Sequence, residues 1–125
     1  MLNHATDQET VEFVKEKTTV LDEVLKEMER QVSKFGIQNH PFYTDGNACE
    51  YAQANGIILN GDVAKIVCDS KASYGNVSYF DILLEEVMEA ADEGRFEDIE
   101  MARMELVQVA AVAISAIESI DRNRK

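Results

Sequence analysis

The strongest constraint on the fold is an apolar run near the C-terminus, Val107–Ile117, inside a predicted helix from about Phe96 to Arg122. This run is apolar nearly all round, so the helix has to be buried on more than one side. It is too short and too polar at its ends to cross a bilayer. The chain has few other elements that could cover it. We therefore expect an all-α helical bundle that is completed by self-association.

Apolar residues recur at three- and four-residue steps through most of the chain, which predicts four to five helices. The first is a long amphipathic helix from about Thr10 to Gly36. The only proline, Pro41, and four of the six glycines fall between positions 36 and 61, so this stretch should be mostly loop. The other helices are expected at about 48–54 and 62–72, and from Ser78 as the N-cap to Gly94.

The composition indicates one acidic domain. With 125 residues, 46% of them apolar, and no Pro/Gly/Ser-rich linker, we predict a single domain over residues 1–125, with residues 1–8 frayed. The formal charge of -12 repels nucleic-acid backbones and anionic membranes, so neither duplex nucleic acid nor a membrane is an expected partner. No basic segment followed by an apolar run opens the sequence, which predicts a cytoplasmic protein. Cys49 and Cys68 lack metal-ligand spacing and should be free thiols.

Two short polar motifs on adjacent predicted helices are the main candidates for chemistry. They are Glu86-x-x-Glu89 and Glu105-x-x-Gln108. Residues three apart lie on one side of a helix, so each motif directs two side chains to one point. Two such helices packed side by side nearly complete an oxygen cage for a hard divalent cation such as Mg²⁺.

Glu105 carries more weight than the glutamates of the preceding helix. That helix keeps its glutamates away from its apolar stripe, where a solvated charged face is the simpler explanation. These glutamates are Glu85, Glu86 and Glu89. Glu105 shares a helix face with Val112 and other uncharged residues, where an ionised carboxylate is costly without compensation. It requires either a metal ion or a salt bridge, for example to Arg30 or Lys34.

The two motifs and a segment upstream resemble the MazG-like nucleoside triphosphate pyrophosphohydrolases. The family pattern is E-x-x-E, a spacer and E-x-x-D, and it is similar to Leu83-Leu84-Glu85-Glu86-Val87-Met88-Glu89-Ala90 followed by Glu105-Leu106-Val107-Gln108. Upstream, Arg30-Gln31-x-x-Lys34-x-Gly36-x-Gln38-x-His40-Pro41 resembles the first helix and loop of a subgroup from bacteria and their phages. The resemblance covers roughly residues 27 to 122.

This resemblance implies an all-α domain that assembles as a homodimer or homotetramer. It also implies hydrolysis of nucleoside triphosphates between the α and β phosphates, with Mg²⁺, or Mn²⁺, as the cofactor. Carried over by position, the metal ligands are Glu86, Glu89 and Glu105, with Gln108 where the family has its aspartate. Glu85, beside these ligands, would accept a proton from the attacking water that the metal orients.

A polyphosphate substrate needs cationic contacts. Arg30 and Lys34 lie one turn apart on the first helix and are the favoured contacts. The remaining candidates are Lys65, Lys71 and Arg103. Gln38 and His40, in the loop after this helix, are candidates for contacts to the base, ribose or phosphate. The alternative for His40 is an imidazole that stabilises the turn or lies in solvent.

Gln108 leaves more than one function open. A glutamine oxygen can bind Mg²⁺ but carries no charge, so affinity for the ion should fall. Either three carboxylates suffice for catalysis, or the site only binds nucleotides, or Gln108 forms a hydrogen bond across a helix interface. Three functions follow: a Mg²⁺-dependent pyrophosphohydrolase acting on (d)NTPs, a non-catalytic nucleotide-binding or sequestering protein on the same scaffold, and an acidic helical protein-interaction module.

Overall fold

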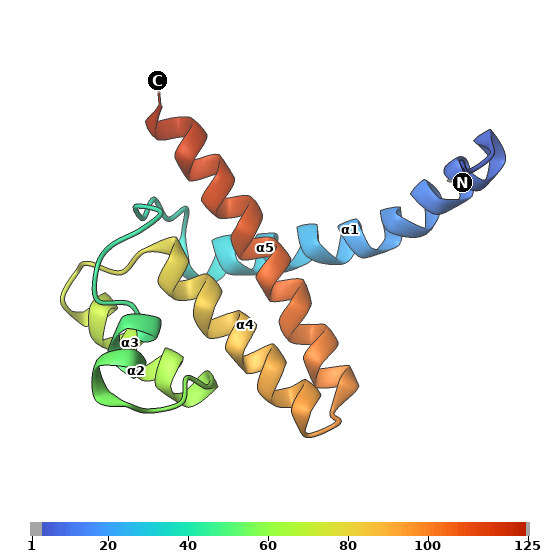
Figure 1. Ribbon diagram of the computed structural model, residues 1–125. Coiled ribbons are helices and arrows are strands. Elements are labelled where there is room, and N and C mark those ends of the chain that lie inside the picture. Colours follow the sequence, from blue (N-terminus) through green and yellow to red (C-terminus); the bar gives the residue numbers. More distant parts are fainter. Residues whose placement is uncertain (1–3, 125) are drawn as a thin grey trace.

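The protein is built from five α-helices, and the computed structural model describes residues 4–124, with no strand among them. The helices are α1 (Asp7–Phe35), α2 (Ala48–Asn55), α3 (Gly61–Ser73), α4 (Tyr79–Arg95) and α5 (Ile99–Asn123). Figure 1 shows α4 and α5 as an antiparallel hairpin, with α2 and α3 on one side and α1 crossing α5 on the other. The expected all-α class is therefore confirmed.

The start of α1 is set by a capping box. The Thr6 hydroxyl accepts from the Glu9 amide at 3.1 Å, and the Glu9 carboxylate accepts from the Thr6 amide at 3.4 Å. These bonds satisfy amides that a helix end leaves without partners. The helix therefore begins at Asp7, earlier than the sequence pattern predicted. Of residues 1–8, expected to be frayed, the first three lie outside the described part of the chain and the last two are helical.

The turn between α4 and α5 differs from the prediction, which began the last helix at Phe96. Asp98 is the N-cap of α5 and accepts from the Met101 amide at 3.2 Å, so this helix begins at Ile99. Phe96 belongs to the end of α4. Between the two helices, Glu97 has a φ of 64°, in the left-handed region that non-glycine residues seldom occupy. This residue reverses the chain direction.

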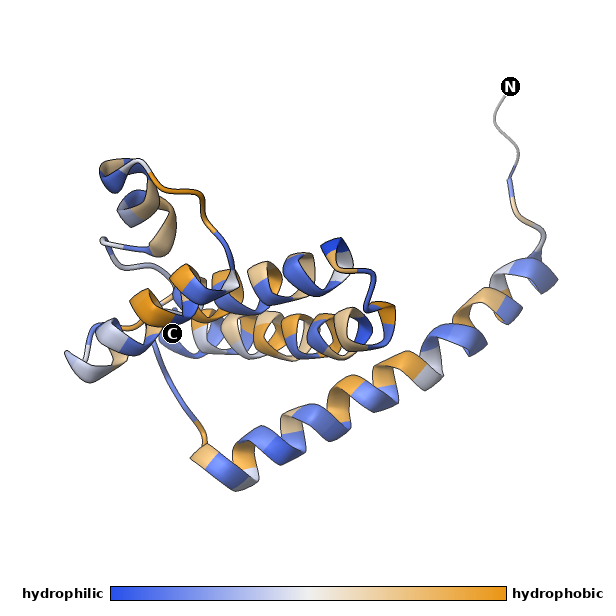
Figure 2. Ribbon diagram, turned by 90° about the horizontal axis from the view of Figure 1, so that it is seen from below, coloured by the Kyte–Doolittle hydropathy of each residue, from blue (hydrophilic) through white to orange (hydrophobic). Residues whose placement is uncertain are grey.

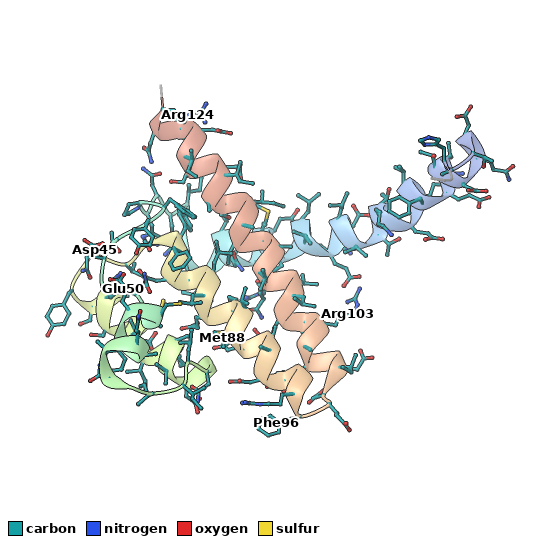
Figure 3. All side chains as sticks on the ribbon, in the orientation of Figure 1. Asp45, Glu50, Met88, Phe96, Arg103 and Arg124 are labelled. Carbon is teal, nitrogen blue, oxygen red and sulfur yellow. The ribbon has the colours of Figure 1, made fainter. Side chains whose placement is uncertain are left out.

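Two small clusters pack on opposite sides of α4. One lies between α4 and α5 and consists of Tyr79, Val112 and Ala116. The other lies between α2 and α3 and consists of Ala48, Ala64 and Val67. Met88 of α4, labelled in Figure 3, packs against the second cluster. The hairpin is thus held from both sides, which fixes the direction of the side chains on α4.

A buried ion pair joins α3 and α4. Lys71 Nζ lies 2.9 Å from Asp81 Oδ2, and these side chains are only 8% and 1% exposed. Lys71 also donates to Thr44 Oγ1 at 2.8 Å, in the loop between α1 and α2. Asp81 accepts from the amide and the hydroxyl of Ser78, each at 2.9 Å, and Ser78 is the N-cap of α4, as predicted. Lys71, considered as a phosphate contact, is instead part of the interior.

Only part of α1 is held by its own chain (Figure 1). Arg103 of α5 donates to both carboxylate oxygens of Glu23 at 2.7 Å, and Val24 is the buried residue of α1. The last helix packs against α4 and α1, yet Leu106 and Ile117 remain 56% and 57% exposed. One copy of the chain therefore leaves apolar helix surface uncovered. None of the described helices combines the length and apolar character that a bilayer crossing requires.

Candidate functional site

Three glutamates of α4 form a compact group of carboxylates. Glu85, Glu86 and Glu89 each offer one oxygen, and these oxygens lie within 4.8 Å of one another. Steps of three and four residues place their side chains on one side of the helix. All three are half-buried rather than freely solvated. The structure thus brings together the two predicted ligands of α4 and adds Glu85 to them.

Glu105 of α5 is not one of the three residues whose oxygens lie within 4.8 Å of one another, but it is close enough to raise the pKa values of Glu86 and Glu89. Its Oε2 atom is buried without a hydrogen-bond partner, and so is Oε2 of Glu86. Among the described residues Glu105 forms no salt bridge with Arg30 or Lys34, and Arg30 instead pairs with Glu27 at 2.6 Å. A buried oxygen without a partner costs free energy. The structure therefore does not support a salt bridge as the partner of Glu105, and the position of this carboxylate is compatible with a bound cation.

The raised pKa values show that the ionised forms of these carboxyl groups are poorly compensated in the fold. Burial first, and then the neighbouring Glu105 carboxyl, raise the pKa of Glu86 to about 9. Burial and the charges of Glu85 and Glu105 raise the pKa of Glu89 to about 7. Burial also raises the pKa of Glu85, an effect that the charge of Lys65 partly offsets. Hard divalent cations bind to such oxygen sets, so the residues present fit a cation of this type.

The N-terminus of α3 is pressed against the same face of α4. The Gly61 amide donates to Asp92 Oδ2 at 2.7 Å. A Cβ atom on Gly61 would lie 2.8 Å from this oxygen and 3.2 Å from Glu89 Cγ, so a larger residue would displace one of them. The close approach holds the Glu89 end of the carboxylate group in place.

A cavity of about 590 Å³ lies beside the carboxylates, between the second half of α1, the loop after it, α4 and α5. Glu86 and Gln108 line it, and so do three of the predicted substrate contacts. These contacts are Arg30, Lys34 and Gln38. Glu86 is therefore shared between the carboxylate group and the cavity.

The predicted contacts differ in how they are held. Arg30 is fixed by Glu27, and the charge of Glu86 adds to the effect of Glu27 in raising the pKa of Arg30. Lys34 places its Nζ 5.0 Å from the centre of the Phe35 ring. His40 does not line the cavity, since its ring packs edge-on against Tyr79 at 5.2 Å. Burial lowers the pKa of His40, which favours a neutral imidazole.

Sequence reasoning missed part of the cavity wall. Phe35 and Tyr79 supply aromatic surface, and Arg122, near the end of α5, supplies a third cation. Arg122 Nη2 lies 3.3 Å from the Gln38 carbonyl oxygen, which also accepts from Tyr79 Oη at 2.8 Å. No local motif marks Arg122, because its position depends on how α5 crosses the loop after α1.

Gln108 is half-buried between two hollows. It lines the main cavity together with Glu86, and it also lines a more open groove of about 340 Å³ with Arg30 and Arg103. The amide of Gln108 can bind a cation through its oxygen or donate a hydrogen bond to a polar group, in either the cavity or the groove.

Comparison of the chain with models of protein families, with curated proteins and with solved structures found no match.

Without a divalent cation, the protein should lose stability as the pH rises from about 5 to about 9. The pKa of Glu86 is about 9 in the fold against an ordinary value of 4.5, so the folded protein binds more protons than the unfolded chain in this interval. Stability therefore falls with rising pH, and Mg²⁺ should reduce the loss. Thermal unfolding across this pH range, in EDTA and in Mg²⁺, measures both effects.

Glu86→Gln provides the control for this pH dependence. The lowered pKa of His40 acts in the opposite direction near its ordinary value of 6.5, and the variant keeps that contribution. The difference between wild type and variant thus isolates the carboxyl group. A difference that does not change with pH would contradict the raised pKa of Glu86.

Proposed function

We propose that the protein is a Mg²⁺-dependent nucleotide pyrophosphohydrolase that cleaves (d)NTPs to (d)NMPs and pyrophosphate in the cytoplasm. The observation that carries the proposal is the position of Glu86, which belongs to the carboxylate group and also lines the cavity with its cations. A site that hydrolyses a polyphosphate needs a metal-binding face and a cationic face in contact with one bound molecule. The resemblance of the motifs to MazG-like proteins agrees with this chemistry.

The carboxylates would hold the ion and move a proton. Glu86, Glu89 and Glu105 offer the oxygens, two of which are buried without a partner. When bound, Mg²⁺ supplies a Lewis acid for the α-phosphate and an oriented water. Glu85 lies beside these residues, and its raised pKa makes it a better base than an ordinary glutamate, so it would accept the proton of the attacking water. The water oxygen bonds to the α-phosphorus as the bond to the bridging oxygen breaks and pyrophosphate leaves.

The opposite wall of the cavity would bind the nucleotide. Arg30 and Lys34 face the leaving phosphates, and the ion pair to Glu27 holds the Arg30 guanidinium in position before the ligand arrives. Phe35 lines the cavity and is 57% exposed, so it offers aromatic surface to a base or ribose, whereas Tyr79 is only 4% exposed and supports the wall behind it. The cationic contacts to the phosphates would be the same for every nucleotide, so selection of the base would depend on the aromatic part of the cavity.

A panel of (d)NTPs, assayed for monophosphate and pyrophosphate with Mg²⁺ or Mn²⁺, tests the proposal. Release of pyrophosphate from at least one member, lost in EDTA, is the expected result. Release of inorganic phosphate instead would place the cleavage at another bond and contradict the assignment. No turnover combined with nucleotide-dependent thermal stabilisation would support the second candidate, a nucleotide-binding protein without catalysis.

Gln108→Asp should strengthen Mg²⁺ binding. The substitution adds a charge at the position where Gln108 lines the cavity beside Glu86, and further carboxylates raise affinity for a hard cation. We expect the dissociation constant for Mg²⁺ to fall by about tenfold, which is the lower end of the effect that a change in one group around a metal site produces. Calorimetric titration with Mg²⁺ measures this. Gln108→Glu separates the effect of charge from that of length, and an unchanged affinity in both variants would place Gln108 outside the metal site.

A further inference from the structure

A stripe of mostly apolar side chains runs along α1 and is largely exposed in one copy of the chain. Its positions follow one another at alternating steps of three and four residues, the spacing of the core positions in a coiled coil. We call this stripe the seam; it consists of Val11, Val14, Thr18, Leu21, Leu25, Met28, Val32 and Phe35. Six of these residues are between 49% and 57% exposed. A seam of this length predicts a helical partner.

Within the described residues 4–124, the first half of α1 is exposed along its whole length. We call residues 7–22 the arm, because all of them are exposed and Glu23, which pairs with Arg103 of α5, is the first residue of α1 that is not. Figure 2 shows the arm as an extended helix with hydrophobic patches that runs away from the other helices. Phe13 and Val20, which lie outside the seam, are also 58% and 43% exposed. The apolar face of the arm is therefore broad enough for contact with two helices, and most of the stability of a helix in a protein comes from packing of such a face.

We propose that two copies of this chain pair through the seam, with their α1 helices antiparallel and fully overlapped. The facing residues are then Val11 and Phe35 of the second copy, Val14 and Val32, Thr18 and Met28, and Leu21 and Leu25. The arm of each copy lies along the second half of α1 in the other. Met28, Val32 and Phe35 also line the cavity, so the arm of one copy forms the outer wall of the cavity of the other.

The polar residues beside the seam agree with this register. Lys15 of each copy lies opposite Glu29 of the other, which gives two ion pairs. The Thr18 hydroxyl already donates to the Val14 carbonyl at 3.2 Å, so its methyl group can enter the seam without an unpaired donor. Asp22 of the two copies meet at the centre, which is a cost of this arrangement.

A parallel pair would leave the arm less covered. The two arms would then contact only each other, and Phe13 and Val20 would stay exposed on the outside. In the antiparallel pair each arm lies beside α1, α4 and α5 of the second copy, at the mouth of the cavity. The breadth of the apolar face therefore favours the antiparallel arrangement.

The charge of α1 disfavours a lipid surface as the alternative occupant. The helix carries eight acidic and five basic side chains. Helices that lie on membranes present a basic polar face to anionic lipids. The mixed charges of α1 agree better with a second copy of the chain, in which acidic and basic residues of the two helices can pair.

Cysteine cross-linking tests the direction of pairing, in a Cys49→Ser, Cys68→Ala background, since both cysteines are free. Tagged Val14→Cys protein is co-expressed with untagged Val32→Cys protein and then oxidised, and each variant is also oxidised alone. The expected result is a mixed disulfide dimer and no dimer from either variant alone. Self-cross-linking of each single variant would show parallel pairing, and no cross-link with a monomeric mass would show another occupant; both overturn the proposal.

Two further variants check the energetics by mass measurement over a dilution series. Asp22→Asn should tighten the antiparallel dimer, whereas it would weaken a parallel one by removing the pair between Asp22 and Lys17 of the second copy. Leu21→Asp should raise the dissociation constant at least about a hundredfold, because it buries a charge in the seam. Leu21 is 55% exposed within its own chain, so the substitution should not disturb the packing of α2–α5. The circular dichroism spectrum of the variant should therefore remain predominantly helical. An unchanged dissociation constant in Leu21→Asp would overturn the proposal. These measurements need no nucleotide, so they are independent of the proposed catalysis.

Discussion

Replacing Glu86 by glutamine should nearly abolish turnover and at the same time stabilise the protein in EDTA. A metal ion contributes several kcal/mol to the transition state of phosphoryl transfer, and each 1.36 kcal/mol is tenfold in rate, so we expect a loss of at least about a hundredfold in kcat. The gain in stability follows from the raised pKa of Glu86, about 9, which shows that its ionised form is disfavoured in the fold. The uncharged amide avoids this cost.

Pyrophosphate release and thermal unfolding, each with and without Mg²⁺, measure the two effects. Glu100→Gln is the matched control, since it removes an exposed carboxylate from α5 outside the group. It should leave turnover and the response to Mg²⁺ unchanged. A Glu86→Gln protein that is less stable than wild type in EDTA would show that Glu86 has a structural partner, and the metal assignment would then be wrong.

Replacing Lys71 by methionine should destabilise the fold by about 3 to 5 kcal/mol, the cost of leaving one charge of a buried pair without its partner. Asp81 would keep its contacts to Ser78 but lose the cation at 2.9 Å, and its Oδ1 atom has no hydrogen-bond partner even in the wild type. For a domain of this size the loss corresponds to a melting temperature lower by roughly 10 °C or more. Chemical denaturation gives the free energy directly.

Lys65→Met is the comparison for this effect. Lys65 pairs with Asp69 at 3.1 Å, but the two side chains are 59% and 63% exposed. Solvent screening leaves such an exposed pair with little effect on the free energy of unfolding. Adding Asp81→Asn to Lys71→Met should recover part of the loss, because it removes the unpaired charge. Equal destabilisation by Lys65→Met and Lys71→Met would contradict the structural role of the buried pair.

The order and type of the helices could be predicted from the sequence because their apolar residues recur with helical spacing. The Ser78 cap was also predictable, since a serine stands directly before the apolar stripe of α4. The start of α5 was not, because Phe96 continues the apolar pattern while the left-handed conformation of Glu97 ends α4. Periodicity locates a helix better than it locates its ends.

The candidate site was predictable where its residues are close in sequence. Glu105 on an uncharged helix face required compensation, and the structure places Glu86 rather than a base beside it. The interior role of Lys71 and the presence of Arg122 at the cavity depend on contacts between distant segments. Such contacts leave no periodic signal, so these two residues could not be assigned from the sequence. The metal, the substrate and the oligomer remain predictions.

The carboxylate group lies entirely within the α4–α5 hairpin, whereas Arg30, Lys34 and Gln38 come from α1 and the loop that follows it. The part that would perform the reaction and the part that would select the molecule are therefore separate stretches of chain. Changes in α1 can alter ligand preference during evolution while the hairpin, and with it the chemistry, stays constant. A chimera that carries a foreign first helix on this hairpin should thus inherit a new preference and keep the same bond cleavage.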